Sequence, residues 1–414
     1  MPKFAIVFLF IAMTFLSWGV YGPVLHEGQY AMGSPAQPAS LRPLICVGIA
    51  YFVIAVVVPV VFLKTKGEKG SWSFGGVAWS FAAGAAGAVG ALGIILAFKS
   101  RGSPLYVMPL VFGMAPVVNT FVTMFMSRTF KEASKIFFAG VTIVAVGAAG
   151  VLFFKPTAKN IEVEETSNGE KVAVTITTFS DGSETKQRWP AGNGFITPVE
   201  LKKLSAKAHK AYLKNKPLEF GKVLMIGLSI ALTAVCWGSY GPVLHKGQTK
   251  MAGSRLRPFI CVGLAYFAIA VVVPFMALGA GGGGDAEWTA GGISWSLFAG
   301  AVGAIGALGI IMAFNFGGKP IFVMPLVFGG APVVNTFTTV LSEGTIGQLS
   351  SAFAASLALV IGGAVMVLIF APKPGKKPSG DEGRSKEAES ESGSDSKPSE
   401  ASEPASQPQS DEQP

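Results

Sequence analysis

Two asparagines, Asn119 and Asn335, are polar residues placed deep within long apolar segments. Each lies about fifteen residues into its segment. At about 1.5 Å per helical residue, this places it some 20 Å deep in a hydrocarbon core of about 30 Å. An amide at that depth needs a hydrogen-bond partner, which is either a substrate or a neighbouring helix. The sequence leaves both alternatives open.

The two asparagines belong to a motif that occurs twice. It reads VMPLVFGMAPVVNTF over Val107–Phe121 and VMPLVFGGAPVVNTF over Val323–Phe337, so fourteen of fifteen positions are identical. Proline removes a backbone donor, which predicts a helix break at each of Pro109, Pro116, Pro325 and Pro332. Freed backbone groups survive in lipid only where protein or a water-lined cavity satisfies them. Interrupted segments at matching places in two halves indicate the binding site of a transporter.

A second repeated motif contains histidine. It reads SWGVYGPVLHEGQ over Ser17–Gln29 and CWGSYGPVLHKGQ over Cys236–Gln248, with ten of thirteen positions identical. A histidine with a pKa of about 6.5 can change charge near neutral pH, whereas the alternative is a side chain satisfied by headgroups or by a nearby carbonyl. A Gly-Pro pair one turn earlier can loosen the helix. We therefore predict gates at Gly22, Pro23, His26, Gly241, Pro242 and His245.

Two arginines, Arg42 and Arg257, precede the second apolar segment of each half. We include them among the candidate gate residues because a guanidinium there can bind an anionic group of a substrate. The alternative is that both side chains extend to the lipid headgroups.

Tryptophans in the apolar segments are candidates for stacking on a sugar or a base. Trp18 and Trp237 belong to the histidine-containing motif, and Trp79 and Trp295 begin the third segment of each half. An aromatic belt at the membrane interface explains Trp79 and Trp295 equally well.

Catalytic chemistry is not indicated. No Asp or Glu lies in any of the long apolar segments, so the sequence lacks a buried carboxylate relay for proton coupling. The three cysteines, Cys46, Cys236 and Cys261, lie inside apolar segments and have no metal-ligand spacing. We predict a protein that is not an enzyme and that has no cofactor or metal.

The apolar segments predict an all-α membrane protein. Half of the 414 residues are apolar and 14% are charged, and the apolar residues come in runs of about twenty, the length of a membrane-spanning helix. The first half is expected to span the membrane at Phe4–Leu25, Leu44–Leu63, Phe74–Phe98, Leu105–Met126 and Ile136–Phe154. The second half is expected to do so at Val223–Leu244, Phe259–Leu278, Ile293–Phe314, Ile321–Leu341 and Ala352–Phe370.

Ten transmembrane helices in two repeats of five predict an inverted arrangement, because an odd number of spans reverses the polarity of the second copy. If the N-terminus is cytoplasmic, fifteen basic residues fall in cytoplasmic loops and three in the opposite short loops. Both termini are then cytoplasmic, in a plasma or inner membrane. The net charge of +9 lies in loops and a linker and does not indicate nucleic acid. The lysine-rich linker falls on the external side against this bias, although long loops translocate largely regardless of charge.

The third span of each half carries glycine at every third position: Gly84, Gly87, Gly90 and Gly93, matched by Gly300, Gly303, Gly306 and Gly309. These glycines favour close packing of helices. Alternatively, they leave room for a ligand.

Four regions follow from these patterns: a first repeat over 1–155, a hydrophilic linker over 156–219, a second repeat over 220–372 and a tail over 373–414. In the linker, Lys171–Thr178 and Glu184–Trp189 predict a hairpin. A capping box at Thr197 predicts an amphipathic helix on the membrane surface, with a solvated basic linker as the alternative. The tail, rich in Ser, Glu and Pro, is expected to be disordered.

This architecture, with related motifs in both halves, resembles the drug/metabolite transporter superfamily, in particular its EamA-type and sugar- or ureide-permease-like branches. The resemblance covers 1–155 and 220–372. It implies a central cavity formed by the first four helices of each repeat, with the fifth helix peripheral and often at a homodimer contact. It also implies substrate contacts from Trp18, Tyr21, Trp79, Asn119, Trp237, Tyr240, Trp295 and Asn335. The long linker departs from the family pattern.

The expected function is secondary transport of a small polar metabolite, such as a sugar, nucleoside or ureide, by alternating access. The expected partners are the lipid bilayer, a small-molecule substrate and a second copy of the chain. The competing hypothesis is a non-transporting membrane sensor or scaffold that acts through its linker and tail.

Overall fold

The computed structural model describes residues 3–33, 37–154, 161–165, 171–178, 184–190, 220–282, 286–316, 320–343 and 349–372. Within these ranges, nine helices are long and apolar enough to cross a membrane. The chain is therefore an all-α multi-pass membrane protein in its main part. The apolar stretch Leu326–Ser342 of a further helix is shorter.

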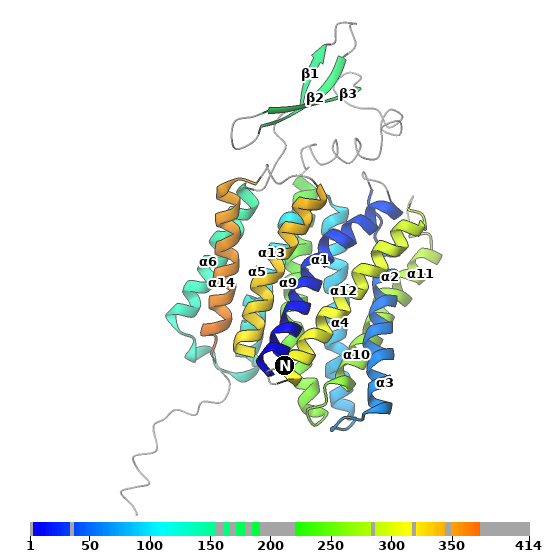
Figure 1. Ribbon diagram of the computed structural model, residues 1–414, viewed down its shortest axis with the longest axis vertical. Coiled ribbons are helices and arrows are strands. Elements are labelled where there is room, and N and C mark those ends of the chain that lie inside the picture. Colours follow the sequence, from blue (N-terminus) through cyan, green and yellow to red (C-terminus); the bar gives the residue numbers. More distant parts are fainter. Residues whose placement is uncertain are drawn as a thin grey trace, which may run out of the picture. The chain divides into compact units, whose positions relative to one another are not determined.

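The first half of the chain forms one series of helices (Figure 1). They are α1 (Lys3–Met32), α2 (Leu41–Phe52), the π-helical η1 (Val53–Val57), α3 (Val58–Thr65), α4 (Phe74–Lys99), α5 (Pro104–Ser127), the 3-10 helix η2 (Phe130–Glu132) and α6 (Lys135–Phe154). The elements α2, η1 and α3 together make one span, Leu41–Thr65.

The second half forms another series of helices. It consists of α9 (Phe220–Lys250), α10 (Leu256–Tyr266), the π-helical η3 (Phe267–Val272), α11 (Val273–Gly279), α12 (Ala290–Asn315), α13 (Pro320–Glu343) and α14 (Ser351–Phe370). Here α10, η3 and α11 together make the span Leu256–Gly279.

Three strands lie between the two halves: β1 (Ile161–Glu165), β2 (Lys171–Thr178) and β3 (Glu184–Pro190). They pair antiparallel in the order β1-β2-β3, with Thr175 opposite Ile161 on one side and Gln187 on the other. The turn before β3, the amphipathic helix expected after Thr197 and the tail lie outside the described residues.

The structure corrects the expected ends of the first span in each half. We expected these spans to end at Leu25 and Leu244, but α1 continues to Met32 and α9 to Lys250. Pro23 and Pro242 lie inside these helices rather than at their ends. The helix α1 continues past the polar residues that follow His26, because the fold accommodates them. The side chain of Gln29 is fully buried and donates to the carbonyl oxygens of Ala39 and Ile95, at 2.8 and 3.1 Å.

The prediction that prolines break the fourth span of each half is also wrong. Pro109 and Pro116 lie within the continuous helix α5, and α13 likewise runs without interruption through Pro325 and Pro332. Membrane helices tolerate proline where neighbouring helices and local adjustments satisfy the freed carbonyls. The real departure from α-helix occurs in the second span of each half. There, π turns precede Pro59 and Pro274, since a carbonyl whose usual donor is a proline can accept from the next residue instead.

The two halves are interlocked rather than set side by side. The helix α1 packs along α12, and α4 packs along α9, while α6 pairs with α14 at one edge of the bundle (Figure 1). The same hydrogen bond occurs in both long pairs: Thr14 Oγ1 donates to the carbonyl of Gly306, and Thr233 Oγ1 to that of Gly90, each at 3.1 Å. Each half therefore completes its core with a helix of the other.

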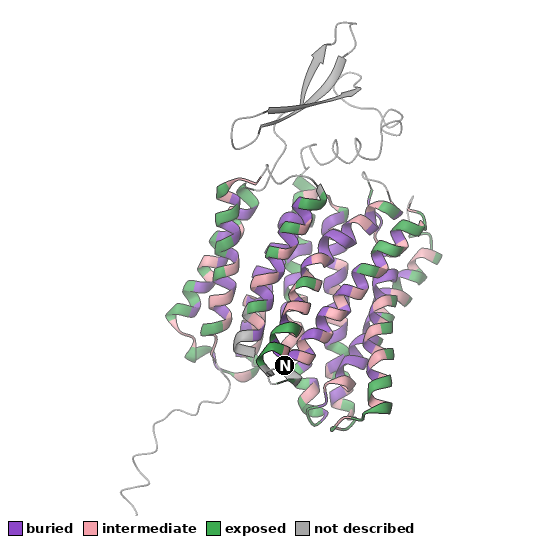
Figure 2. Cartoon of the chain, viewed as in Figure 1, coloured by how far each residue is buried: buried purple, intermediate pink, exposed green. Residues whose placement is uncertain are grey.

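The glycine face of the third span makes this interlocking possible. A Cβ at Gly90 would collide with the Trp237 ring, and one at Gly306 would collide with the Trp18 ring. Gly84 and Gly300 lie equally close to the backbone of a facing helix, at Val262 and Val47. These contacts fill the space beside the glycines, which agrees with the packing alternative. Buried residues accordingly line the inner faces of the helices (Figure 2).

Gly90→Ala is expected to destabilise the protein. The added methyl has no space beside Trp237, and such overpacking typically costs about 1–3 kcal/mol. The matched control is Gly362→Ala in α14, where a new Cβ meets nothing within 4 Å and alanine favours the helix by up to about 1 kcal/mol. Melting curves of the purified protein in detergent should show a lower midpoint for Gly90→Ala and an equal or higher one for Gly362→Ala. Equal midpoints would contradict the packing described here.

Candidate functional site

Aromatic side chains from both halves meet in the core of the bundle, in a group that we call the aromatic centre. It comprises Trp18 and Tyr21 of α1, Tyr51 of α2, Phe112 of α5, Trp237 and Tyr240 of α9, Tyr266 of α10 and Phe328 of α13. Every member has its equivalent in the other half of the sequence. The centre is therefore assembled from four matched pairs.

One matched pair stacks directly. The rings of Tyr51 and Tyr266 lie parallel, with centroids 3.8 Å apart and an interplanar angle of 1°. They approach this closely because glycines remove side chains at the crossing of their spans: Gly48 faces Ala270, and Gly263 faces Ala55. This stack joins the second span of one half to the second span of the other.

The two tryptophans are held by equivalent hydrogen bonds. The indole N–H of Trp18 donates to the carbonyl of Gly303 at 3.1 Å, and that of Trp237 donates to the carbonyl of Gly87 at 3.2 Å. Phe112 lies between them, with its centroid 6.4 Å from Trp18 and 6.2 Å from Trp237. Because both indole donors are already used, the tryptophans offer a ligand their faces and edges rather than a hydrogen bond.

The tyrosines supply the polar groups of the aromatic centre. Tyr21, Tyr51, Tyr240 and Tyr266 belong to one cluster, in which Tyr51 stacks on Tyr266 and the Tyr21 ring lies 6.2 Å from the Trp237 ring. The hydroxyl of Tyr21 is buried and has no hydrogen-bond partner among the described residues. A buried polar group without a partner costs about 1–3 kcal/mol, so a ligand or water that reaches this hydroxyl gains the missing bond. The arrangement is suited to an uncharged ring that stacks on aromatic faces and exchanges hydrogen bonds with hydroxyls.

Asn335 lies at a junction of three helices outside this centre. It is fully buried, and its Nδ2 donates to the carbonyl of Pro104 in the first turn of α5, at 2.8 Å. Its Oδ1 faces Gly22 of α1, beside Met108. The partner of this amide is thus a neighbouring helix. The equivalent Asn119 is only partly buried, and its Nδ2 points towards Gly241 of α9.

The structure does not bring Trp79 and Trp295 to the aromatic centre. The ammonium of Lys246 lies 4.1 Å from the centroid of the Trp79 ring, near the end of α9. The Trp295 side chain is 45% exposed, on the outer face of α12. Both positions agree with the aromatic-belt alternative.

The two histidines have different surroundings. His26 is 5% exposed and packs edge-on against Tyr30 and Phe98, with ring centroids 4.3 and 5.1 Å away. His245, its equivalent, is exposed. Both lie within helices, about one and a half turns before the helix ends.

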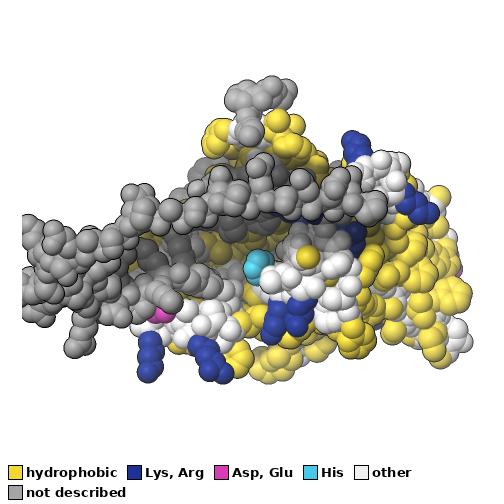
Figure 3. Space-filling model, turned by 90° about the horizontal axis from the view of Figure 1, so that it is seen from below, with side chains coloured by type: hydrophobic (Ala, Val, Ile, Leu, Met, Phe, Trp, Pro, Cys, Tyr) yellow, Lys and Arg dark blue, Asp and Glu magenta, His cyan; other side chains and the backbone are white. Residues whose placement is uncertain are grey.

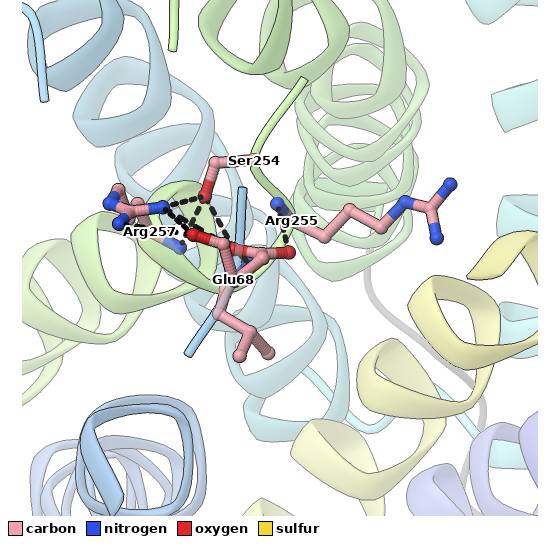
Figure 4. A network of polar contacts seen from close by, with 5 residues as sticks. Glu68, Ser254, Arg255 and Arg257 are labelled. Atoms are coloured by element: carbon pink, nitrogen blue, oxygen red, sulfur yellow. Dashed lines mark hydrogen bonds and ion pairs between the residues drawn. The ribbon is translucent and has the colours of Figure 1, made fainter. Parts of the chain in front are cut away.

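The arginines contact loops of the opposite half. Arg257 lies 3.7 Å from the Glu68 carboxylate and donates to Ser254 Oγ at 3.2 Å. Glu68 also accepts from Ser254 Oγ at 2.6 Å and from the backbone N–H groups of Arg255 and Leu256 at 2.9 and 3.2 Å (Figure 4). A carboxylate of one half thus caps the first turn of α10 in the other. Arg42, the equivalent of Arg257, lies over the Trp288 ring at 5.8 Å.

The ends of the bundle near the two histidines differ in closure. We call them the His26 end and the His245 end; they are opposite, because α1 and α9 run antiparallel. Residues Tyr21–His26 are all buried, whereas among their equivalents Tyr240–His245 only Leu244 is buried. Figure 3 looks onto the end where α1 begins, and a histidine side chain is exposed there. The segment of α1 at the His26 end is therefore buried, and the matching segment of α9 at the His245 end is more exposed.

Sequence reasoning missed part of this site. Tyr51 and Tyr266 lie in the repeated segments LRPLICVGIAYF and LRPFICVGLAYF, and Phe112 and Phe328 lie inside the repeated asparagine motif. Repetition of an aromatic residue at the same place in both halves was the available signal. Glu68 carried no such signal, since its partner lies more than 180 residues away in the chain.

Comparison of the chain with family models and with curated proteins finds no match.

Glu68→Gln is expected to lower stability by about 1–2 kcal/mol, because an amide accepts fewer bonds from the first turn of α10 and carries no charge for Arg257. Thermal unfolding in detergent measures the change. Glu132→Gln, at an exposed position in η2, serves as the control and should leave the midpoint unchanged. An unchanged midpoint for Glu68→Gln would show that the cap is dispensable.

Proposed function

We propose that this protein is a secondary transporter that moves a small, uncharged, polar metabolite across the membrane by alternating access. The observation that carries the proposal is the unequal closure of two ends that the sequence makes equivalent. His26 is 5% exposed, whereas His245 is exposed, although ten of the thirteen residues of their motifs are identical. If each copy of the motif can adopt the packing of the other copy, the protein can switch which of its two ends is closed.

The inverted repeat is part of this proposal. Ten spans, with α13 as the ninth in chain order, give two copies of five, and the odd number reverses the second copy. The matched contacts of α1 with α12 and of α4 with α9 support this symmetry. The same architecture underlies the resemblance to the drug/metabolite transporter superfamily, in which the fifth helix of each repeat is peripheral. The edge formed by α6 and α14 is then the place for a homodimer contact.

The orientation follows from the basic residues. We place the protein in a plasma or inner membrane with both termini in the cytoplasm. The lysine-rich short loops then lie on the cytoplasmic side. In this orientation the His26 end faces the exterior and the His245 end faces the cytoplasm, and we interpret the greater exposure of the His245 end as an inward-open state. The linker with its strands lies outside in this arrangement.

The chemistry of the aromatic centre supports the substrate class. Glu27 lies near the end of α1, and the aromatic centre contains only aromatic rings and phenol hydroxyls. A charged substrate would lose its hydration without gaining a counter-charge there. A sugar, a nucleoside or a ureide-like ring offers an apolar face to stack and polar edges to bond. The competing function, a sensor or scaffold, finds support in the three-stranded sheet of the linker.

Flux assays test the proposal. The protein is reconstituted in liposomes and screened with radiolabelled sugars, nucleosides, ureides and amino acids. We expect uptake of a neutral ring compound, reduced at least tenfold by Trp237→Ala, which removes a wall of the aromatic centre. Trp295→Ala, at an exposed position, is the matched control and should retain uptake.

Two results would overturn the proposal. One is absence of flux for the whole panel while the purified linker binds a ligand, which would favour the sensor. The other is equal loss of uptake in Trp237→Ala and Trp295→Ala, which would remove the aromatic centre from the transport path.

A further inference from the structure

The glycine faces of α4 and α12 are filled by neighbouring helices at every position except one. At seven of the eight glycines, an added Cβ would lie within 3.0 Å of another atom. These seven are Gly84, Gly87, Gly90, Gly93, Gly300, Gly306 and Gly309. At Gly303, the nearest atoms would lie 3.6 to 3.7 Å from the added Cβ, which is an ordinary van der Waals distance. The backbone of α12 therefore borders an unfilled space at Gly303, with room for at least a methyl group.

Gly303 also differs from the other seven glycines in its accessibility. It is partly exposed, whereas the other seven are buried. The exposed side chain of Phe298 marks the outer face of α12, and Gly303 lies about 140° around the helix from it, at about 100° per residue. The chain neighbours Val302 and Ala304 are themselves buried. The accessible surface of Gly303 therefore faces the interior of the bundle.

Two buried tyrosines border this space. The atoms nearest to an added Cβ at Gly303 are Cδ2 and Cε2 of Tyr21, both at 3.6 Å, and Cε2 of Tyr51, at 3.7 Å. The two side chains are 5% and 7% exposed. Since Cε2 of a tyrosine is bonded to the carbon that carries the hydroxyl, the Tyr21 hydroxyl lies at the edge of the space. This hydroxyl is buried and has no hydrogen-bond partner among the described residues.

The equivalent position in the first half has no such space. Gly87 corresponds to Gly303, and a Cβ there would lie 2.8 Å from Cε2 of Tyr266 and 3.1 Å from its hydroxyl oxygen. Tyr266 thus fills the position that its counterpart Tyr51 leaves open. Two halves with repeated motifs therefore form one open position, at α12, and one closed position, at α4.

We propose that the space beside Gly303, which we call the Gly303 subsite, binds an oxygen of an uncharged ring, and that the Tyr21 hydroxyl donates a hydrogen bond to this oxygen. The oxygen belongs to a ring carbonyl or to a ring hydroxyl. The inference rests on the proposed function and deepens it, because it places the solute against α12 rather than α4. Tyr21 is then the residue that selects solutes with an acceptor oxygen.

The walls of the subsite determine this ligand chemistry. The atoms nearest to the space belong to aromatic rings. The Gly303 carbonyl already accepts from the Trp18 indole at 3.1 Å, whereas the Tyr21 hydroxyl still lacks a bond. A phenol supplies one donor and carries no charge in its protonated form. A neutral oxygen satisfies this donor, whereas an ion would lose its hydration without gaining a counter-charge from the aromatic walls.

Melting midpoints in detergent, without solute, are the first test of the subsite. Tyr21→Phe removes only a hydroxyl that lacks a partner, so the midpoint should equal or exceed that of the parent. Gly303→Ala adds a methyl at ordinary contact distance and should also give an equal or higher midpoint. A lower midpoint for Tyr21→Phe would show that the hydroxyl is bonded within the protein, and a lower one for Gly303→Ala would show that the space is already filled. Either result overturns the proposal.

Equilibrium binding to the purified full-length protein is the second test, with radiolabelled uridine and glucose as the two probes. Uridine offers ring carbonyls, and glucose offers ring hydroxyls. For the probe that binds the parent, Tyr21→Phe and Gly303→Ala should each weaken the affinity on the order of tenfold, because the first removes the donor and the second occupies the space. Gly227→Ala in α9 is the matched control. It lies at an exposed position where a new Cβ meets nothing within 4 Å, and it should keep the affinity of the parent.

Weaker binding at equal or higher stability is a result that a purely structural role of Tyr21 and Gly303 does not give. The proposal is overturned if both variants bind the probe as the parent does, or if the parent binds neither probe. Binding needs no transport, so the two hypotheses fail separately. Probe binding with the expected losses but without flux refutes the transporter only, whereas flux of a probe that both variants bind as the parent does refutes the subsite only.

Discussion

The structure depends on the close contact between a tryptophan of one half and a glycine face of the other. Trp18 and Trp237 each place an indole ring where a glycine has no side chain and donate the N–H to a glycine carbonyl one turn away. In lipid there is little hydrophobic gain from helix association, so close packing and buried hydrogen bonds must hold the helices together. These two contacts fix the pairs α1–α12 and α4–α9, and each pair joins residues from both halves. The remaining helices, with the aromatic centre between them, are arranged around these pairs.

This constraint explains where the molecule can move. The contacts of the two pairs are alike at both ends of the bundle, so the alternating access that we propose is expected to preserve them. The repeated motifs of the two halves are nearly identical, so the proposed transporter is expected to have two packings of similar energy, and a solute that binds one of them somewhat better can shift the population. In this proposal, the His26 end shows the closed packing of the repeated motif, and the His245 end of the same molecule shows the more open packing.

Much of the fold was predictable from the sequence because its dominant signals are local. Runs of about twenty apolar residues identify membrane helices, and repeated motifs identify equivalent positions. The end of α1 was not predictable in this way, since the burial of Gln29 depends on carbonyls of Ala39 and Ile95 that only the fold brings near. The effect of the prolines in α5 and α13 was misjudged for a similar reason, because neighbouring helices decide whether a proline interrupts a helix. Trp18 and Trp237 were identified as candidates, whereas the Tyr51–Tyr266 stack required knowledge of which spans cross.

The central claim is that the two ends open in turn, and paired distance measurements test it most directly. Spin labels are placed at Tyr30 and Ser100 across the His26 end, and at the equivalent positions Thr249 and Phe316 across the His245 end. Pulsed electron resonance in lipid nanodiscs then gives both distance distributions, with and without the solute that the flux assays identify. The account predicts two populations at each pair that change reciprocally on adding the solute, one distance lengthening as the other shortens. Distances that change in the same direction, or single distributions that the transported solute leaves unchanged, would contradict it.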